Sequence, residues 1–401
     1  MGLTVRRSCG SLALAVLSAA LILPAAAASR PPVDYRTHLV DSRLQARQPA
    51  PPFGGVPDDY RANSIGWLSP KVGWALGAAA CAGKTCSDVI GTTDGGATWS
   101  LLGSVPSPIS VVGEPAGAGV TDVRFVTSDI GWAFGPKLFV TVDGGATWSR
   151  TAIPGNGKQV LSLATSASAG AYAVVSHCRY ADGPCRHPLT FWRTSSLEST
   201  SWTRIRVHLP TSLAADVAVR GRSVYVVDEL VDGGTDRLYA STEGSSFTAR
   251  PVPCDNAKDI GLIQVVPTSA SRVSMLCEDS IGFGQAFKKV YRSADNGQTY
   301  RSAGVVGMDG IQAQLAASPS GNLAVAASGS TGSFIFDDDH GKSWDEVVDF
   351  SDFGAGWNDI VYTTDRTAWV VYAPVGFFHG AGQIYVTHDA GATWNPVPLD
   401  G

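Results

Sequence analysis

The chain has 401 residues with 45 Gly, 23 Pro and 11 Trp, and charged residues make up only 16%. This composition excludes coiled coils and helical bundles, and a hydrophobic content of 44% excludes a disordered chain. The formal net charge of −5 argues against a nucleic-acid binder, because such proteins cluster Lys and Arg to neutralise phosphates. We therefore expect a soluble, all-β protein with a sizeable core.

Residues 1–28 are predicted to form a signal peptide. Arg6 and Arg7 provide a basic start, an uncharged apolar run covers residues 12–23, and four alanines occupy positions 25–28. This layout is typical of a secretory signal, and the apolar run is too short to span a bilayer. Cleavage is expected after Ala28, with Ala27 as the alternative. We thus expect a secreted, extracellular protein without membrane insertion.

Residues 29–60 are predicted to form a proline-rich N-terminal arm or linker. Regular structure is prevented there by Pro31, Pro32, Pro49, Pro51, Pro52 and Pro57. Beyond it, residues 61–401 are expected to form a single domain.

An eight-residue string recurs along that domain. Residues 92–99 read TTDGGATW, residues 141–148 read TVDGGATW, and residues 387–394 read THDAGATW. Near-copies cover residues 293–300 and 337–344, and worn versions lie at 194–202 and 241–247. The markers of the seven copies are Asp94, Asp143, Ser196, Glu243, Asp295, Asp339 and Asp389, separated by 44 to 53 residues. Such a period is typical of propeller blades.

Strand patterns fall at matching positions between the strings. In the second unit, β-rich runs cover residues 120–126, 130–135, 137–142 and 147–153, and the third and seventh units follow the same plan. Four strands per unit and seven units predict a seven-bladed β-propeller of four-stranded antiparallel blades. We name the strands of each blade A to D, from innermost to outermost.

The repeated strings resemble the Asp-box, S/T-x-D-x-G-x-T-W, of the bacterial neuraminidase repeat family, which includes sialidases and many non-enzymatic propellers. The resemblance covers roughly residues 61–400 and implies Asp-box turns between strands C and D, away from the active-site face. The Asp and Thr are expected to bond N–H groups of their own turn, and the aromatic to fill the wedge between neighbouring sheets. A structural role is therefore expected for Asp94, Asp143, Asp295, Asp339, Asp389, Trp99, Trp148, Trp344 and Trp394.

A second repeated string is the Gly-Trp pair of residues 65–67, 72–74 and 130–132, placed at expected strand starts. It is similar to strings in the seven-bladed propellers typified by photosystem assembly factors and in their secreted bacterial relatives. Nothing else in the sequence points to photosynthesis. We expect Trp67, Trp74 and Trp132 to pack in blade cores.

The catalytic motifs of sialidases are not matched. Retaining sialidases need an arginine triad, a Tyr nucleophile with a Glu partner and an Asp acid/base. The string Tyr60-Arg61-Ala62-Asn63 lacks the Ile-Pro that follows the first Arg in that family. Asp88 has a suitable spacing from Arg61 for an acid/base, but a second and third Arg cannot be assigned. We expect a non-enzymatic binding or scaffold module for protein or glycan ligands. The alternative is a glycoside hydrolase, sialidase-like or another propeller glycosidase, using loop carboxylates.

Six cysteines remain once Cys9 leaves with the signal peptide, which suits an oxidising compartment. Sequence alone leaves many pairings open. Local pairing is the economical interpretation and predicts Cys81–Cys86, Cys178–Cys185 and Cys254–Cys277. A zinc site is disfavoured because no CxxC motif occurs.

The loops between strands B and C and between blades (D to A) should share one face of the propeller, which we call the B–C/D–A face. The long irregular loops fall on it, so a protein or glycan ligand is expected there. Its charges lean acidic, which would favour cationic groups or calcium; no other cofactor or metal is expected. The ligand-face candidates are Asp228, Glu229, Asp232, Asp236, Phe377, Phe378 and His379. We expect a monomer.

Overall fold

The computed structural model describes residues 54–110, 119–179, 186–212, 214–229, 237–254, 259–282, 285–310, 312–329, 332–338, 343–350, 355–374 and 382–399. The chain divides into two units, Met1–Arg30 and Pro31–Gly401, and the first lies wholly outside the described residues. The signal peptide therefore stays a prediction. In the described ranges, no helix is long and apolar enough to cross a membrane.

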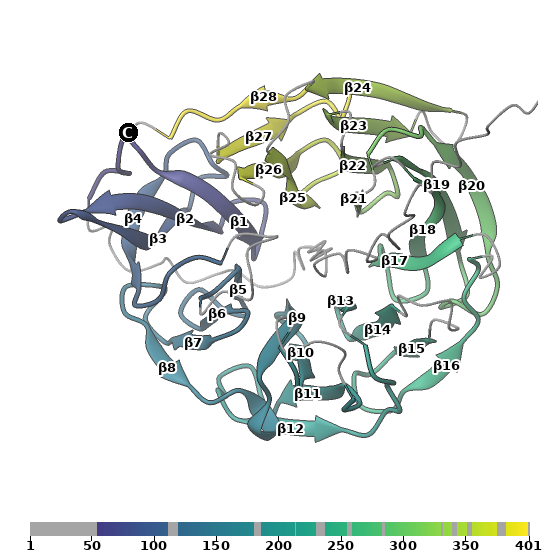
Figure 1. Cartoon of the computed structure of the whole chain (residues 1–401), viewed down its shortest axis with the longest axis horizontal. Helices are drawn as coiled ribbons and strands as arrows, with labels where there is room; N and C mark the ends of the chain where they lie inside the picture. Colours follow the sequence, from purple (N-terminus) through teal and green to yellow (C-terminus); the bar gives the residue numbers. More distant parts are fainter. Residues whose placement is uncertain are drawn as a thin grey trace, which may run out of the picture. The chain divides into compact units, whose positions relative to one another are not determined.

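Within these ranges, 28 strands form seven antiparallel four-stranded sheets, the blades of a propeller (Figure 1). Blades 1 and 2 comprise β1 (Arg61–Trp67), β2 (Gly73–Cys81), β3 (Lys84–Thr92), β4 (Ser100–Val105), β5 (Asp122–Phe125), β6 (Gly131–Phe134), β7 (Leu138–Thr141) and β8 (Ser149–Thr151). Blades 3 and 4 comprise β9 (Gln159–Ser166), β10 (Gly170–Ser176), β11 (Thr190–Thr194), β12 (Trp202–Ile205), β13 (Ala214–Arg220), β14 (Ser223–Glu229), β15 (Arg237–Ser241) and β16 (Thr248–Arg250). Blades 5 and 6 comprise β17 (Asp259–Pro267), β18 (Val273–Gly282), β19 (Gln285–Ser293), β20 (Arg301–Val306), β21 (Gln312–Ala317), β22 (Leu323–Gly329), β23 (Gly332–Asp338) and β24 (Trp344–Phe350). Blade 7 comprises β25 (Ala355–Tyr362), β26 (Ala368–Pro374), β27 (Gln383–Thr387) and β28 (Asn395–Pro396).

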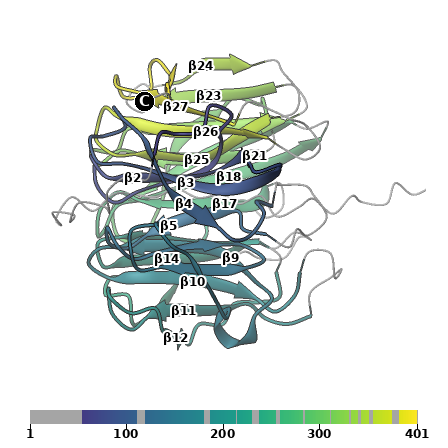
Figure 2. The same cartoon turned by 90° about the vertical axis from the view of Figure 1, so that its left-hand side faces the viewer.

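The seven-bladed prediction is confirmed. Neighbouring strands in every sheet are consecutive in the chain. The first strand of each blade lies nearest the centre of the ring in Figure 1, and Figure 2 shows the blades from the side. The units with worn strings, marked by Ser196 and Glu243, are complete blades 3 and 4. The spacing of the repeats therefore identified blades even where the string is worn.

The ring closes by packing between blades 1 and 7, each of which is built from consecutive strands in the described chain. Trp369 of β26 packs against both Trp67 and Trp99 of blade 1, with ring centroids 4.6 Å from Trp67 and 6.4 Å from Trp99. Gly96, with φ of +84°, passes so close that a Cβ atom would lie 2.2 Å from the Trp369 ring. Only glycine satisfies both that conformation and that approach. At the outer edge of blade 1, the peptide N–H of Leu101 donates to Gly54 at the end of the arm.

The repeated turns have the expected hydrogen bonds. Asp94 accepts from the N–H and the hydroxyl of Thr98, at 3.0 and 2.6 Å, and from the Thr92 hydroxyl at 2.8 Å. Asp143, Asp295 and Asp389 accept the same three bonds in their own turns. Partial burial opposes ionisation of Asp94, but the bonds from Thr98 and Thr92 outweigh it and lower its pKa. Asp339 lies outside the described residues.

The aromatic residue that ends each turn contacts the preceding blade, as predicted. Trp99 packs against Trp369 of blade 7, and Trp148 joins a core cluster with Leu102 of blade 1. The indole N–H of Trp344 donates to the Ala303 carbonyl of blade 5 at 3.1 Å. Half-buried Trp394 packs against a cluster that contains blade 6 residues.

The Gly-Trp residues also pack in cores, but one of them is placed differently from the prediction. Trp74 and Trp132 are fully buried near the starts of β2 and β6, as expected. Trp67 ends β1 instead of starting a strand. The reason is that the A–B turn of blade 1 falls directly after it, at residues 68–72.

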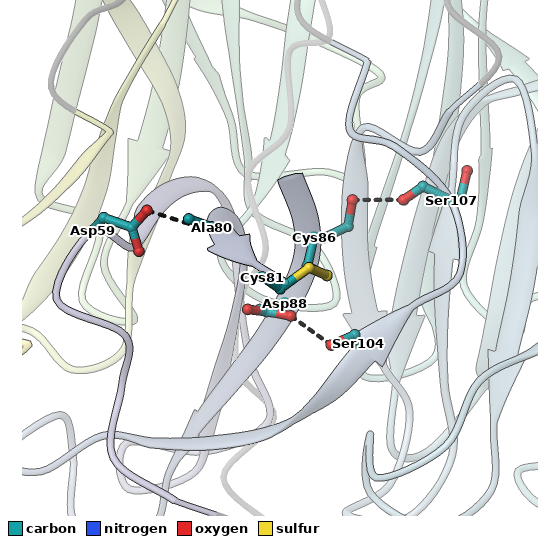
Figure 3. The surroundings of a disulfide bond; sticks show 8 residues. Asp59, Ala80, Cys81, Cys86, Asp88, Ser104 and Ser107 are labelled. Atoms are coloured by element: carbon teal, nitrogen blue, oxygen red, sulfur yellow. Dashed lines mark hydrogen bonds between the residues drawn. A yellow bond between two sulfur atoms is a disulfide. The ribbon is translucent and has the colours of Figure 1, made fainter. Parts of the chain in front are cut away.

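Two predicted disulfides are confirmed. Cys81–Cys86 joins β2 to β3 at the B–C turn of blade 1, where Figure 3 shows it near Asp59 and Asp88. Cys254–Cys277 joins the segment after blade 4 to the second strand of blade 5. Cys178 is also disulfide-bonded, and its predicted partner Cys185 lies outside the described residues.

Candidate functional site

Five polar side chains of the innermost strands join neighbouring blades. Each of these five accepts a hydrogen bond from a backbone N–H on the innermost strand of the next blade. Five such junctions are Ser64 with Val123, Ser162 with Val217, Gln264 with Leu315, Gln314 with Ile360, and Asp359 with Ile65. We call these five acceptors the inner polar belt. Because their oxygens are bonded within the ring, they stabilise the fold and are poor candidates for ligand binding.

A buried ion pair reinforces the belt where blades 1, 2 and 7 meet. Arg124 of β5 donates to Asp359 of β25 at 2.5 Å, and Asp122 lies 3.7 Å away. Arg124 also donates to the Ser64 hydroxyl and the Ile65 carbonyl of β1, each at 3.0 Å. Burial raises the pKa of Asp359, and the Arg124 guanidinium opposes that rise. This arrangement connects three blades through one guanidinium, and all its members are buried.

The residues weighed for sialidase chemistry do not converge in the described structure. Arg61 is exposed at the start of β1, whereas buried Asp88 on β3 accepts a hydrogen bond from Ser104 at 2.5 Å (Figure 3). The arginines available for the second and third positions of such a triad lie on four different blades: Arg204, Arg237, Arg272, Arg292 and Arg366. A carboxylate clamp needs three arginines around one substrate group.

Of the ligand-face candidates, the structure places only Asp228 with its side chain. Asp228 is fully buried and accepts from the peptide N–H of Arg237 at 3.0 Å, so it stabilises the edge of blade 4 and does not form an exposed rim. Glu229 ends β14, and its side chain lies outside what is described. The others lie outside the described residues altogether: Asp232, Asp236, Phe377, Phe378 and His379.

Acidic Glu278, expected on the B–C/D–A face, is also buried, beside Lys288 of blade 5. The fully buried Lys288 ammonium donates to the carbonyls of Ala286, Met308, Asp309 and Gly310 at 2.7 to 3.3 Å. Burial lowers its pKa to about 8, although Glu278 and Asp309 oppose the change. Glu278 itself is buried opposite Lys288. The Lys288 ammonium therefore holds the segment that leads from blade 5 to blade 6 against β19.

The B–C/D–A face carries a basic pocket between blades 2 and 3. Its volume is about 460 Å³, within the range of small-ligand sites. It is lined by Lys137 of the B–C turn, Arg150 of β8, Lys158 of the connection to blade 3, and Arg179 after β10. No acidic side chain lines it among the described residues. The pocket is therefore positively charged, whereas the sequence predicted a negatively charged B–C/D–A face.

Backbone contacts hold the pocket in place. The N–H of Lys137 donates to Gly119 at 3.1 Å, and the N–H of Lys158 donates to Ser176 of blade 3 at 2.8 Å. Between them, the short helix η1 (Pro154–Asn156) contains Gly155 at φ of +64°. A Cβ atom on Gly155 would lie 2.5 Å from the Trp192 ring, so η1 approaches blade 3 too closely for a side chain. The pocket wall thus spans two blades.

On the opposite face, Asp337 of β23 lies beside blade 7. Gly391 approaches both its carboxylate and the Tyr362 hydroxyl, and Tyr362 donates to the Ala390 carbonyl at 2.6 Å. Burial raises the pKa of Asp337 to about 7, and the negative charge of Asp338 adds to the rise. A hydrogen bond from the Asp338 backbone opposes it.

In the described residues, no group of three His, Cys, Asp or Glu side chains could hold a metal ion.

Asp337→Asn is expected to stabilise the protein at pH 8 by roughly 1–2 kcal/mol, after allowance for solvent screening. The folded state keeps the Asp337 proton to a higher pH than the unfolded chain, whose pKa is near 3.8, so stability falls as pH rises from about 4 to 7. Thermal unfolding at pH 8 and pH 4 measures this, and the gain should vanish at pH 4. Exposed Asp58→Asn is the charge-matched control. A variant less stable than wild type at both pH values would contradict the expectation.

No family model matches the chain, and no curated protein matches it. Solved structures do match. YCF48 bound to D1 peptide has 16% identity and a TM-score of 0.51, covering 90% of this chain and 99% of that chain. Hydrazine synthase of Kuenenia stuttgartiensis has 11% identity and a TM-score of 0.53, covering 84% of this chain and 98% of that chain. At these identities the likeness shows the β-propeller fold alone.

Proposed function

We propose that the protein is a secreted, non-enzymatic Asp-box propeller that binds a protein or glycan ligand on its B–C/D–A face. Support for export comes from residues 1–28, and support for the Asp-box family comes from the four described turns with identical Asp–Thr bonding. A propeller of similar fold has been solved with a peptide bound, which is consistent with a binding role.

The basic pocket is the observation that carries the proposal. Glycoside hydrolysis usually needs two carboxyl groups facing one sugar, at separations of about 5–10 Å. The described lining contains four cations and no carboxyl group, so it can bind a ligand but offers no acid/base pair. The innermost strands offer little alternative, because the inner polar belt is bonded within the ring.

A glycan array combined with a panel of fluorogenic glycosides tests this function. We expect the purified protein to retain a ligand without turning over any glycoside. Hydrolysis at ordinary enzyme rates, about 1–1000 per second, would overturn the proposal. N-terminal sequencing of the exported protein should begin at Ser29 or Ala28.

A further inference from the structure

We infer that the pocket between blades 2 and 3 is a binding site for an anionic saccharide, one that carries sulfate or carboxylate groups. The inference rests on the proposed function and narrows it to one site and one class of ligand. It is supported by the positive charge of the pocket, by its fixed backbone, and by the apolar surface that lies beside the cations.

Positive charge is concentrated at this pocket. The chain is acidic, with 35 Asp and Glu against 30 Lys and Arg, yet every charged residue in the described pocket lining is a cation. Lys137 is half-buried, and Arg150 and Lys158 are exposed. No acidic partner is recorded for these three side chains within the described ranges. Cations left without acidic partners around one cavity favour an oxyanion, because Lys and Arg form their strongest hydrogen bonds with charged acceptors.

The backbone that carries the three cations is held in place by neighbouring segments. Arg150 is paired with Phe139 across β7 and β8. Lys137 and Lys158 are anchored at their own N–H groups, and Pro136 restricts the backbone just before Lys137. A fixed arrangement lowers the ordering cost of binding, because the backbone is already in place before the ligand arrives.

The apolar surface of the pocket and the short strand beside it indicate the class of ligand. Beside the cations, Leu138 and Ile153 provide apolar surface that suits the C–H face of a sugar ring. An acidic peptide would instead gain most by adding a strand to the exposed edge of blade 2. That edge strand, β8, has only three residues and is followed by Pro154 and η1. A compact pocket beside so short an edge favours a saccharide over an extended peptide.

Isothermal titration with two saccharides tests the inference. One is a chondroitin sulfate hexasaccharide, which carries sulfate and carboxylate groups, and the other is a hexagalacturonate, which carries carboxylates alone. The test variant is Lys137→Gln/Arg150→Gln/Lys158→Gln. The control variant, Lys71→Gln/Arg272→Gln/Arg301→Gln, removes the same number of charges from exposed positions outside the pocket.

We expect at least one saccharide to bind wild type with a dissociation constant of about 1–100 µM. The pocket variant should bind it at least about 30-fold more weakly, since each lost charged contact is worth several-fold or more. The control should stay within about threefold, a difference set by long-range charge alone. Preference for the sulfated hexasaccharide would assign the site to sulfate, and equal binding would assign it to carboxylate.

Three results would overturn the inference. They are equal binding by wild type and the pocket variant, no binding of either saccharide, and tighter binding of a hexaglutamate peptide than of both saccharides. Thermal unfolding of both variants confirms that they are folded, since exposed substitutions usually change stability by less than about 0.5 kcal/mol. The appearance of new reducing ends during titration would contradict the non-enzymatic function separately, whatever the pocket variant does.

Discussion

Replacing Arg124 with Met is expected to lower the free energy of unfolding by about 3–5 kcal/mol. Arg124 is 1% exposed, and its removal leaves Asp122 and Asp359 buried without their shared cation. It also removes the bonds to Ser64 and Ile65 that reach blade 1. Urea-induced unfolding followed by tryptophan fluorescence measures the loss. The exposed Arg272→Met substitution, as a control, should change stability by less than about 0.5 kcal/mol.

A double variant separates the missing cation from the buried charge that it leaves behind. Asp359 has φ of +52°, a conformation that Asn tolerates well, so Asp359→Asn removes the charge without new backbone strain. We expect Arg124→Met/Asp359→Asn to be more stable than Arg124→Met alone, because fewer carboxylates are left unpaired. If the two substitutions were simply additive, the ion pair would not be the reason for the loss.

Trp369→Ala is expected to cost about 3–5 kcal/mol and to weaken the closure of the ring specifically. Trp369 is 2% exposed, and this blade 7 side chain packs against both Trp67 and Trp99 of blade 1. Removing it leaves a cavity at the one junction that joins the first and last blades. Hydrogen exchange should then accelerate first at the N–H groups of Ala62 and Ile65, which donate to blade 7.

A substitution of equal size elsewhere provides the control. Trp132 is fully buried and packs against Trp202 between blades 2 and 3, with ring centroids 5.5 Å apart. Trp132→Ala should cost a similar amount but leave early protection at Ala62 and Ile65 intact. Identical exchange patterns in the two variants would mean that the ring opens as one unit, without a weak junction.

The number and order of the blades could be predicted from the sequence because the fold is periodic. Each copy of the string supplies a turn whose Asp and Thr bond locally, so the turn forms wherever the string occurs. Blades 3 and 4 were predicted from the spacing together with worn versions of the string at residues 194–202 and 241–247. Ring closure by tryptophans was not predictable, because Trp67 and Trp369 lie more than 300 residues apart in the sequence.

The charges of the ligand face were harder to predict. Asp228 and Glu278 fall near predicted loops, but each lies within a strand and is buried. Which side of a strand is buried depends on the register of that strand. Counting the acidic residues in predicted loops gives no information about register. The pocket was missed because Lys137 and Lys158 belong to different loops, and only the adjacency of blades 2 and 3 brings them together. A useful signal was present: residues 136–158 contain three cations, of which Lys137 lies on a B–C segment and Lys158 on a D–A segment.

A crystal structure of the protein with the chondroitin sulfate hexasaccharide is the most direct test of where this propeller binds its ligand. We expect the saccharide between blades 2 and 3, with an anionic group within hydrogen-bonding distance, about 2.7–3.2 Å, of Lys137, Arg150 or Lys158. A saccharide bound on the face of the repeated turns, or over the centre of the ring away from these three residues, would contradict it.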